Sequence, residues 1–235
     1  MYSSAFCKVY NEFGWNYFPE AFAEQLLEWL KRNRVTVKNS LDLACGTGVL
    51  CEVLHQHGIK ASGMDFSEGM IEIARAHDPE IEYEVADMIT YRPDRQFDLV
   101  TWTGDALNHI ISLSDVEQIF RNVHGYLNED GYFIFDILSE KEIPPEEPID
   151  LDFSEDVKAQ FAVFRDEENR IHLKTAVYEN GKLEFEEEIT ETVHDVDKIC
   201  GLLRECGFEV IKCDHQLLDD AKTQVATWYV VAKKL

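Results

Sequence analysis

The sequence predicts an α/β protein built on a doubly wound, mostly parallel seven-stranded sheet, with an antiparallel β meander inserted as a cap. Three observations lead to this prediction. Short apolar segments alternate with helical ones over residues 40–137, which is the order found in parallel sheets with helices on both faces. Near residue 139 the alternation stops, and strand-like segments joined by turn residues follow. A helix and two further strand-like segments then return the chain to the sheet.

The elements of the first part follow in chain order. Apolar residues at helical spacing behind Pro19 predict a leading helix. Two strand, turn and helix units come next, the second with Ser67 as the helix N-cap. Strands are expected at 40–44, 59–65, 81–87, 97–102 and 131–137. Helices are expected at 19–32, 49–57, 68–77 and 116–127.

The later segments complete the division of the chain. Residues 140–156 are rich in Glu, Asp and Pro, and the strand-like stretch after them contains Asn180-Gly181, a pair typical of hairpin turns. A helix at 196–207 and strands at 208–214 and 224–232 close the core. We therefore expect an N-terminal lid and helix at 1–34, an α/β core at 35–138, an inserted antiparallel cap at 139–194, and a closing helix with a strand pair at 195–235.

Charge and composition restrict the class of partner. Asp and Glu total 46 against 22 Lys and Arg, and the net charge of −24 would repel nucleic acid and anionic lipid surfaces. No secretory signal and no run of membrane-spanning length is recognisable. The six cysteines form no C-x-x-C pair, which favours reduced thiols over a zinc site or disulfides. We expect a cytoplasmic protein that binds neither nucleic acid nor membranes, as a monomer or homodimer.

The most informative motif is the turn L-D-L-A-C-G-T-G at Leu41 to Gly48, which is followed at the end of the next predicted strand by Asp65. Small residues let a backbone approach a nucleotide, and a carboxylate at this distance can hold its ribose. The turn departs from the dinucleotide motif G-x-G-x-x-G, because Asp42 precedes it and only Gly46 and Gly48 remain. A carboxylate here suits a cationic ligand group better than a pyrophosphate.

These residues resemble the class I S-adenosylmethionine-dependent methyltransferases, which have a Rossmann-like fold and an acidic residue before a small-x-Gly-x-Gly turn. The resemblance covers residues 40–138 well and is strengthened by Asp65 in G-M-D-F-S and by Asp87 in E-V-A-D-M. It implies that the 35–138 core binds S-adenosylmethionine. The implied cofactor-binding residues are Asp42, Ala44 and Gly46 at the methionine portion, Asp65 at the ribose, Asp87 and Met88 at the adenine, and in addition Tyr10, Phe66 and Thr103.

Each acidic residue also has a purely structural alternative. Asp42 could satisfy backbone amides in the turn, Asp65 could be a charge near the helix start at Ser67, and Asp87 could cap a loop. Cys45 is better explained as a packing residue than as a nucleophile, because no nearby group in the sequence would stabilise a thiolate.

The methyl acceptor should lie beside the segment after the fourth predicted strand, T-G-D-A-L-N-H-I, since ligands of such sheets bind at the carboxyl ends of the strands. Asp105 and Asn108 are candidate substrate contacts, and His109 is a candidate catalytic base, with a solvent-facing histidine as the alternative. No metal is expected, because further acidic ligands for a metal-dependent site cannot be located in the sequence.

The N-terminal Y-N-E-F-G-W-N-Y-F-P resembles the aromatic lid of sugar-amine and glycine N-methyltransferases. By that resemblance Tyr10 is a catalytic candidate, and Trp15 and Tyr17 are substrate contacts. The alternative is that these aromatics only pack the leading helix on the sheet. A cap at 139–194 favours a small acceptor.

The predicted function is S-adenosylmethionine-dependent methyl transfer to nitrogen or oxygen of a small molecule. Two alternatives stay open at this point. A nicotinamide-dependent oxidoreductase is disfavoured by the missing third glycine, and a non-catalytic protein that binds an S-adenosyl cofactor has no direct support in the sequence.

Overall fold

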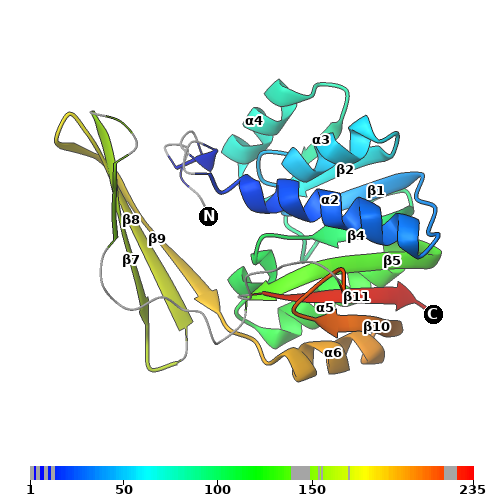
Figure 1. Ribbon diagram of the computed structural model, residues 1–235. Helices are drawn as coiled ribbons and strands as arrows, with labels where there is room; N and C mark the ends of the chain where they lie inside the picture. The colour runs from blue at the N-terminus through cyan, green and yellow to red at the C-terminus, as the bar shows by residue number, and fades with distance from the viewer. Residues whose placement is uncertain are drawn as a thin grey trace.

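The protein has two sheets, a large one covered by helices on both faces and a smaller one that projects to one side (Figure 1). The computed structural model describes residues 14–138, 149–152, 156–168, 170–219 and 227–235, and residues 3, 6, 7, 10, 11 and 154. No helix in these parts of the chain is long and apolar enough to cross a membrane. All six cysteines are free.

The large sheet has seven strands in the order β10-β11-β5-β4-β1-β2-β3. The pairs β1–β2, β1–β4, β2–β3 and β4–β5 are parallel, and β11 runs antiparallel to its two neighbours. This confirms the predicted fold class. The strands are β1 (Asn39–Leu43), β2 (Lys60–Asp65), β3 (Glu82–Val85), β4 (Phe97–Trp102), β5 (Leu127–Leu138), β10 (Phe208–Asp214) and β11 (Thr227–Lys234).

The helices lie close to their predicted positions. Ser67 caps α4 as expected, since its hydroxyl accepts a hydrogen bond from the Met70 amide at 3.4 Å. A short 3-10 helix, η1, follows β4 in the segment that the sequence assigns to the acceptor side. The helices are α2 (Tyr17–Arg32), α3 (Val49–Gln56), α4 (Glu68–His77), η1 (Ala106–His109), α5 (Leu113–Tyr126) and α6 (Val196–Glu205).

Two buried clusters form the core, one on each face of the large sheet. Phe22 of α2, Leu50 of α3 and Ile71 of α4 pack together on one face. On the other face, Phe120 of α5 and Leu203 of α6 pack with apolar side chains of the strands. The strand order reverses between β1 and β4, and in such sheets the ligand crevice lies at the carboxyl ends of the strands at that point.

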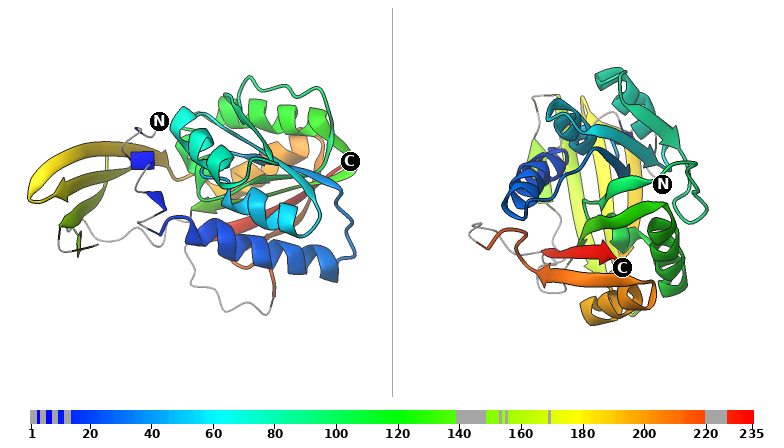
Figure 2. Two further views of the ribbon diagram at one scale, coloured as in Figure 1. Left: turned by 90° about the horizontal axis from the view of Figure 1, so that it is seen from above. Right: turned by 90° about the vertical axis from the view of Figure 1, so that its right-hand side faces the viewer.

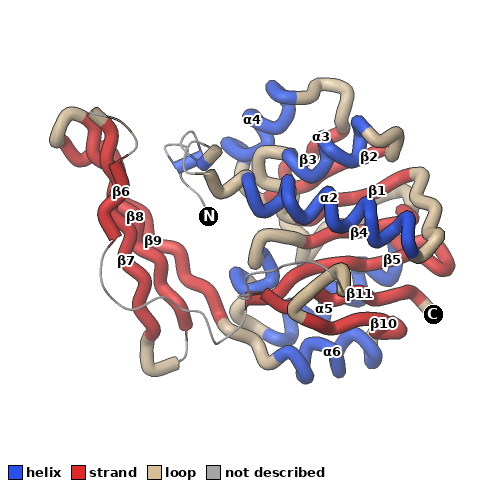
Figure 3. Tube along the Cα trace, viewed as in Figure 1, coloured by secondary structure: helices blue, strands red, loops and turns tan. Residues whose placement is uncertain are grey.

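The smaller sheet is antiparallel, in the order β6-β7-β8-β9, and its strands stand beyond the carboxyl ends of the large sheet (Figures 1 and 3). The strands are β6 (Ile149–Asp152), β7 (Val157–Arg165), β8 (Arg170–Glu179) and β9 (Lys182–Thr192). Asn180 and Gly181 have φ of +52° and +74°, as a type I′ hairpin turn requires. Strand β6 was not expected; its Ile149 and Leu151 alternate with aspartates and pair with β7.

The two faces of this cap sheet have different surroundings because side chains alternate along each strand. Phe185 and Ile189 of β9 belong to a cluster with Phe6 of the N-terminal segment and Met70 of α4. The described residues of the N-terminal segment, which precedes α2, thus lie between the cap sheet and the core (Figure 2).

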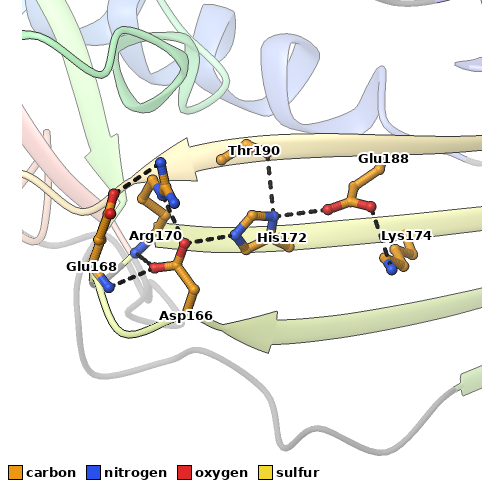
Figure 4. A network of polar contacts seen from close by, with 7 residues as sticks. All are labelled: Asp166, Glu168, Arg170, His172, Lys174, Glu188 and Thr190. Atoms are coloured by element: carbon orange, nitrogen blue, oxygen red, sulfur yellow. Dashed lines mark hydrogen bonds and ion pairs between the residues drawn. The ribbon is translucent and has the colours of Figure 1, made fainter.

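The opposite face of the cap sheet carries a polar network, shown in Figure 4. His172 lies 2.9 Å from the carboxylate of Glu188 and 3.0 Å from that of Asp166. The second oxygen of Glu188 lies 3.4 Å from Lys174. The charge of Glu188 is therefore compensated on the outer face of the cap.

Candidate functional site

A cavity of about 580 Å³ lies at the carboxyl ends of β1, β2 and β4, where the reversal of strand order places it. The core contributes the loops after four strands, and Pro19 comes from α2. The segment before α2 contributes Tyr10 and Asn16, and β9 contributes Glu188, Ile189 and Thr190. The core residues are Asp42, Ala44, Cys45, Gly46, Thr47, Val49, Asp65, Phe66, Ser67, Met70, Asp87, Met88, Ile89, Thr103, Gly104, Ala106, His109 and Ile110.

The turn after β1 brings its backbone to the cavity wall. Ala44, Gly46 and Gly48 all have positive φ, of +54°, +54° and +86°. A Cβ added to Gly46 would meet no atom within 4 Å, whereas one added to Gly48 would collide with the hydroxyl of Tyr83. Gly46 therefore leaves open space at the cavity, and Gly48 lets the start of α3 pack closely on β3.

Asp65 at the end of β2 joins two of the loops around the cavity. Its carboxylate accepts hydrogen bonds from the amides of Gly46 at 3.0 Å and Ser67 at 2.8 Å. Burial raises the pKa of Asp65 above its usual value, and these two amides counteract that rise. The side chain is fixed in orientation, and each oxygen retains a lone pair for a ligand.

Asp42 is only 3% exposed, and its carboxylate accepts a hydrogen bond of 2.6 Å from the Thr101 hydroxyl on neighbouring β4. Burial raises the pKa of Asp42 to about 7, and the nearby carboxylates of Asp65 and Asp136 add to the effect. The sequence left open that Asp42 accepts hydrogen bonds from backbone amides of the turn. The hydrogen bond shown here comes instead from the Thr101 side chain. A cationic group in the cavity would favour its charged form.

Asp87 lines the cavity beyond β3 and also organises its own loop. Its carboxylate accepts from the Ile89 amide at 2.9 Å, and its carbonyl accepts from the amides of Thr90 and Tyr91. The loop-capping alternative is therefore realised alongside the position at the cavity. Phe66, which is 52% exposed, and Met88 provide apolar surface nearby.

Asp136 of β5 is a buried carboxylate that the sequence analysis missed. It is 1% exposed and accepts hydrogen bonds from the amides of Gly104 at 2.8 Å and Asp105 at 2.9 Å. Burial raises its pKa to about 7. The available signal was a charged residue inside the apolar strand F-I-F-D-I, which is rare unless the charge is partnered.

Asp105, His109 and Glu191 meet beside the cavity, with ligand atoms within 4.8 Å of one another. His109 lines the cavity, and its Nε2 lies 3.8 Å from a carboxylate oxygen of Glu191. Burial lowers the pKa of His109 to about 4 and raises that of Glu191 to about 7. Burial also raises the pKa of Asp105, and Glu191 and Asp136 add to this rise.

Glu191 corrects an expectation from the sequence, which located no further acidic group for the acceptor side. Strand β9 is remote in sequence from η1, and only the folding back of the cap sheet brings Glu191 to Asp105 and His109. Two carboxylates and one imidazole are ligand types that also occur in metal sites. The distances between the three groups therefore matter for whether the cluster suits a metal ion or an organic cation.

Two further expectations on the acceptor side need correction. Asn108 is fully buried, and its amide group donates to the Thr192 carbonyl and accepts from the Leu138 amide, both at 2.9 Å. It therefore joins β9 to the end of β5 rather than lining the cavity. Tyr17 is 71% exposed and lies outside the cavity wall.

The aromatic residues of the N-terminal segment are divided between the cavity and the cap. Tyr10 lines the cavity, and burial raises its pKa above the usual value. Trp15 does not line it; its ring stacks on Phe6 at 4.7 Å and meets Phe161 of β7 edge-on at 5.8 Å. Trp15 thus packs the N-terminal segment against the cap sheet.

Asn16 and Thr47 are cavity residues that the sequence analysis did not select. The Thr47 hydroxyl donates to the side-chain oxygen of Asn11 at 2.9 Å. The side-chain oxygen of Asn16 is buried and has no hydrogen-bond partner among the described residues. An unpaired buried acceptor at a cavity wall requires a donor from a ligand or from water.

The cavity wall is strongly acidic. The carboxylates of Asp42, Asp65 and Asp87 line it, and none of its described lining residues is Lys or Arg. Such a wall attracts cationic groups and repels anionic ones.

Comparisons with known proteins agree with this architecture. Residues 41–131 match a family model described as a methyltransferase domain. A Bacillus subtilis (strain 168) protein that bears the name of a methyltransferase, YqeM, is 29% identical over 93% of this chain and 91% of its own length.

Two solved structures share the fold. An S-adenosylmethionine-dependent methyltransferase from Clostridium acetobutylicum ATCC 824 has a TM-score of 0.79 at 23% identity, with 90% of each chain covered. CalS10, an amino pentose methyltransferase from Micromonospora echinaspora solved with S-adenosylmethionine bound, has a TM-score of 0.79 at 16% identity, with 100% of this chain and 98% of that chain covered.

Proposed function

Because this chain is a class I S-adenosylmethionine-dependent methyltransferase, we propose that it transfers the methyl group to a nitrogen or oxygen atom of a small molecule. The observation that carries the proposal is the contribution of cap strand β9 to the cavity wall. Cofactor and acceptor must share about 580 Å³ bounded by the core loops, the N-terminal segment and β9. A space of this size suits a small acceptor.

The residues of the cavity fit the cofactor. S-adenosylmethionine supplies a methyl group on a positively charged sulfonium and also carries a cationic amino group. The unpaired oxygen of Asn16 and the carboxylate of Asp42 could accept hydrogen bonds from that amino group. The absence of Lys and Arg from the described wall suits both positive charges.

The nucleoside portion has suitable partners at the ends of β2 and β3. Asp65 is held in place by two backbone amides and would accept hydrogen bonds from the ribose hydroxyls. Asp87 would hold the adenine amino group, with Phe66, Met88 and Ile89 packing around the ring. The carboxylates of Asp65 and Asp87 thus select adenosine at two points.

On the acceptor side the chain has to orient a nucleophile and exclude water, because the methyl group of a sulfonium is already activated. Tyr10, Thr103 and His109 lie on this part of the wall. Phe6, Tyr10 and Trp15 pack in one cluster with Phe185 and Ile189 of the cap sheet, and Tyr10 also lines the cavity. The amino pentose substrate of CalS10 supports a small acceptor here as well.

The test is release of S-adenosylhomocysteine by the full chain with matched panels of small amines, phenols and carboxylic acids, and with polypeptide and nucleic acid acceptors. We expect turnover with at least one class of small molecule and none with the macromolecules. Turnover with a macromolecule alone would overturn the proposal, as would the absence of S-adenosylhomocysteine binding in calorimetry.

A further inference from the structure

The cluster of Asp105, His109 and Glu191 is the part of the site that the cofactor does not require. Asp105 and His109 lie at the start and end of η1, and Glu191 comes from β9, so the cluster forms only where the cap meets the core. His109 also lines the cavity, which places the cluster beside bound ligands.

Within the described parts of the chain, neither carboxyl of the cluster is paired with a lysine or an arginine. Glu188 on the other face of β9, in contrast, is paired with Lys174 and His172. Outside the cluster, Asp136 and the phenol of Tyr10 interact electrostatically with Asp105, and neither supplies a positive charge. Because partly buried carboxylates need compensation, this spot is suited to a cationic ligand.

The spacing of the cluster can accommodate an ammonium group and is wider than the spacing of neighbouring ligands around magnesium. Three acceptors that each lie about 2.8 Å from one tetrahedral nitrogen are about 4.6 Å apart. Ligands of a magnesium ion lie about 2.1 Å from the metal, and neighbouring ligands are therefore about 3 Å apart. The cluster atoms lie within 4.8 Å of one another, and the 3.8 Å between His109 and Glu191 exceeds a direct hydrogen bond.

The protonation of the cluster suits the same ligand. A pKa of about 4 keeps the His109 imidazole neutral near pH 7, so that it does not repel a cation. A pKa of about 7 allows Glu191 to take up a proton at the same pH.

We infer that Asp105, His109 and Glu191 bind the ammonium group of an amine acceptor and that Glu191 removes its proton before methyl transfer. This inference rests on the proposed function and selects nitrogen as the acceptor atom. An N–H proton moves to a carboxylate oxygen of Glu191, and the freed lone pair on nitrogen forms the new C–N bond. The electrons of the breaking C–S bond go to sulfur, and the product is a methylated ammonium ion.

The same geometry disfavours other acceptors. An alcohol or phenol donates one hydrogen bond and carries no positive charge. It therefore leaves the negative charge of Asp105 and Glu191 uncompensated. A carboxylate acceptor would be repelled by Asp105 and Glu191. A primary or secondary ammonium supplies both the charge and two or three hydrogens.

Sinefungin provides a test that needs no knowledge of the acceptor. In this cofactor analogue a carbon replaces the sulfur and an amino group replaces the transferred methyl group, so its ammonium points toward the acceptor subsite. We expect the wild-type chain to bind sinefungin at least tenfold more tightly than S-adenosylhomocysteine in calorimetry. Glu191→Gln and Asp105→Asn should each weaken sinefungin binding at least tenfold and leave S-adenosylhomocysteine binding within twofold.

Matched controls are available in the same chain. Glu186→Gln makes the same change in β9 outside the cluster, and Asp130→Asn makes it at a second aspartate with positive φ, +64° against +52° at Asp105. Both should keep the wild-type preference for sinefungin. Unchanged S-adenosylhomocysteine binding shows that each variant is folded, because that ligand uses the same cavity.

Three results would overturn the inference: equal wild-type affinity for the two ligands, an unchanged preference in both cluster variants, or loss of the preference when EDTA removes a bound metal. Failure of the proposed function is separate. A chain that methylates only macromolecules, or binds no S-adenosylhomocysteine, refutes the small-molecule methyltransferase without depending on the sinefungin ratio.

Discussion

The prediction that tests the cofactor site most directly concerns Asp65. Its two oxygens are oriented by the amides of Gly46 and Ser67, and the ribose would use the remaining lone pairs. In Asp65→Asn the side chain loses its charge and places an NH₂ group against one of these two donors. One backbone hydrogen bond is therefore lost, and the geometry of the ribose contacts changes.

The expected magnitude follows from the number and kind of contacts. Hydrogen bonds to a charged group contribute about 1.5–3 kcal/mol each, and the asparagine retains part of one of them. We expect a loss of about 2–3 kcal/mol, which is roughly a 30- to 150-fold rise in Kd. Asp65→Ala should weaken binding at least as much. Folding should be little affected, because burial already raises the pKa of Asp65 and the variant removes that buried charge.

The assay is calorimetric titration with S-adenosylhomocysteine and with 5′-methylthioadenosine, which lacks the amino acid portion but keeps the ribose. Both ligands should lose affinity by the same factor in Asp65→Asn. Asp130→Asn, an exposed change near the start of β5, should bind both ligands as the wild type does. A change below threefold, or a loss confined to S-adenosylhomocysteine, would refute the assignment of Asp65 to the ribose.

Three other outcomes are expected. Gly48→Ala should lower the Tm by several degrees, because the new Cβ would meet Tyr83 and the residue has a φ of +86°. The control Gly125→Ala in α5 has open space around it and should be neutral or stabilising. Equal Tm values for the two variants would contradict the packing role of Gly48. Asn108→Ala should cost about 2–3 kcal/mol and speed hydrogen exchange at the Leu138 amide, and an unchanged exchange rate would argue against its link between β5 and β9. The ligand-free protein should gain about 2 kcal/mol of stability when the pH falls from 8 to 6.5, as measured by thermal unfolding at the two pH values. The reason is that three carboxyls, those of Asp42, Asp136 and Glu191, have pKa values of about 7 in the folded state and near 4 in the unfolded state. The folded state therefore binds more protons than the unfolded state in this pH range. A Tm that rises with pH would contradict the prediction.

Local sequence patterns were sufficient for the elements that fold through nearby residues. Ser67 could be recognised as an N-cap, and Asn180-Gly181 as a hairpin turn, because each acts within a few residues of itself. Strand β6 escaped prediction because its alternation is short and lies in an acidic segment, where pairing with β7 decides the conformation.

The acceptor side was predicted less well because its residues are brought together by contacts between distant segments. Asn108 was expected to face a substrate, but the position of Thr192 on β9 turned it into a structural link. Asp136 and Glu191 were missed because one lies within an apolar strand and the other in a strand rich in glutamate, where nothing local distinguishes it.

By itself the sequence determined which segments form helices and strands along the chain, and it identified the acidic glycine turn with Asp65 and Asp87. Both are local properties, because they depend on periodicity and turn chemistry. Only the tertiary structure decided which face of each cap strand meets the core. Side chains alternate along β9, so Glu188 joins the outer network while Glu191 reaches Asp105 and His109. That choice depends on how the cap packs against the segment before α2, and it brings together the residues of the proposed acceptor subsite from segments that are far apart in the sequence.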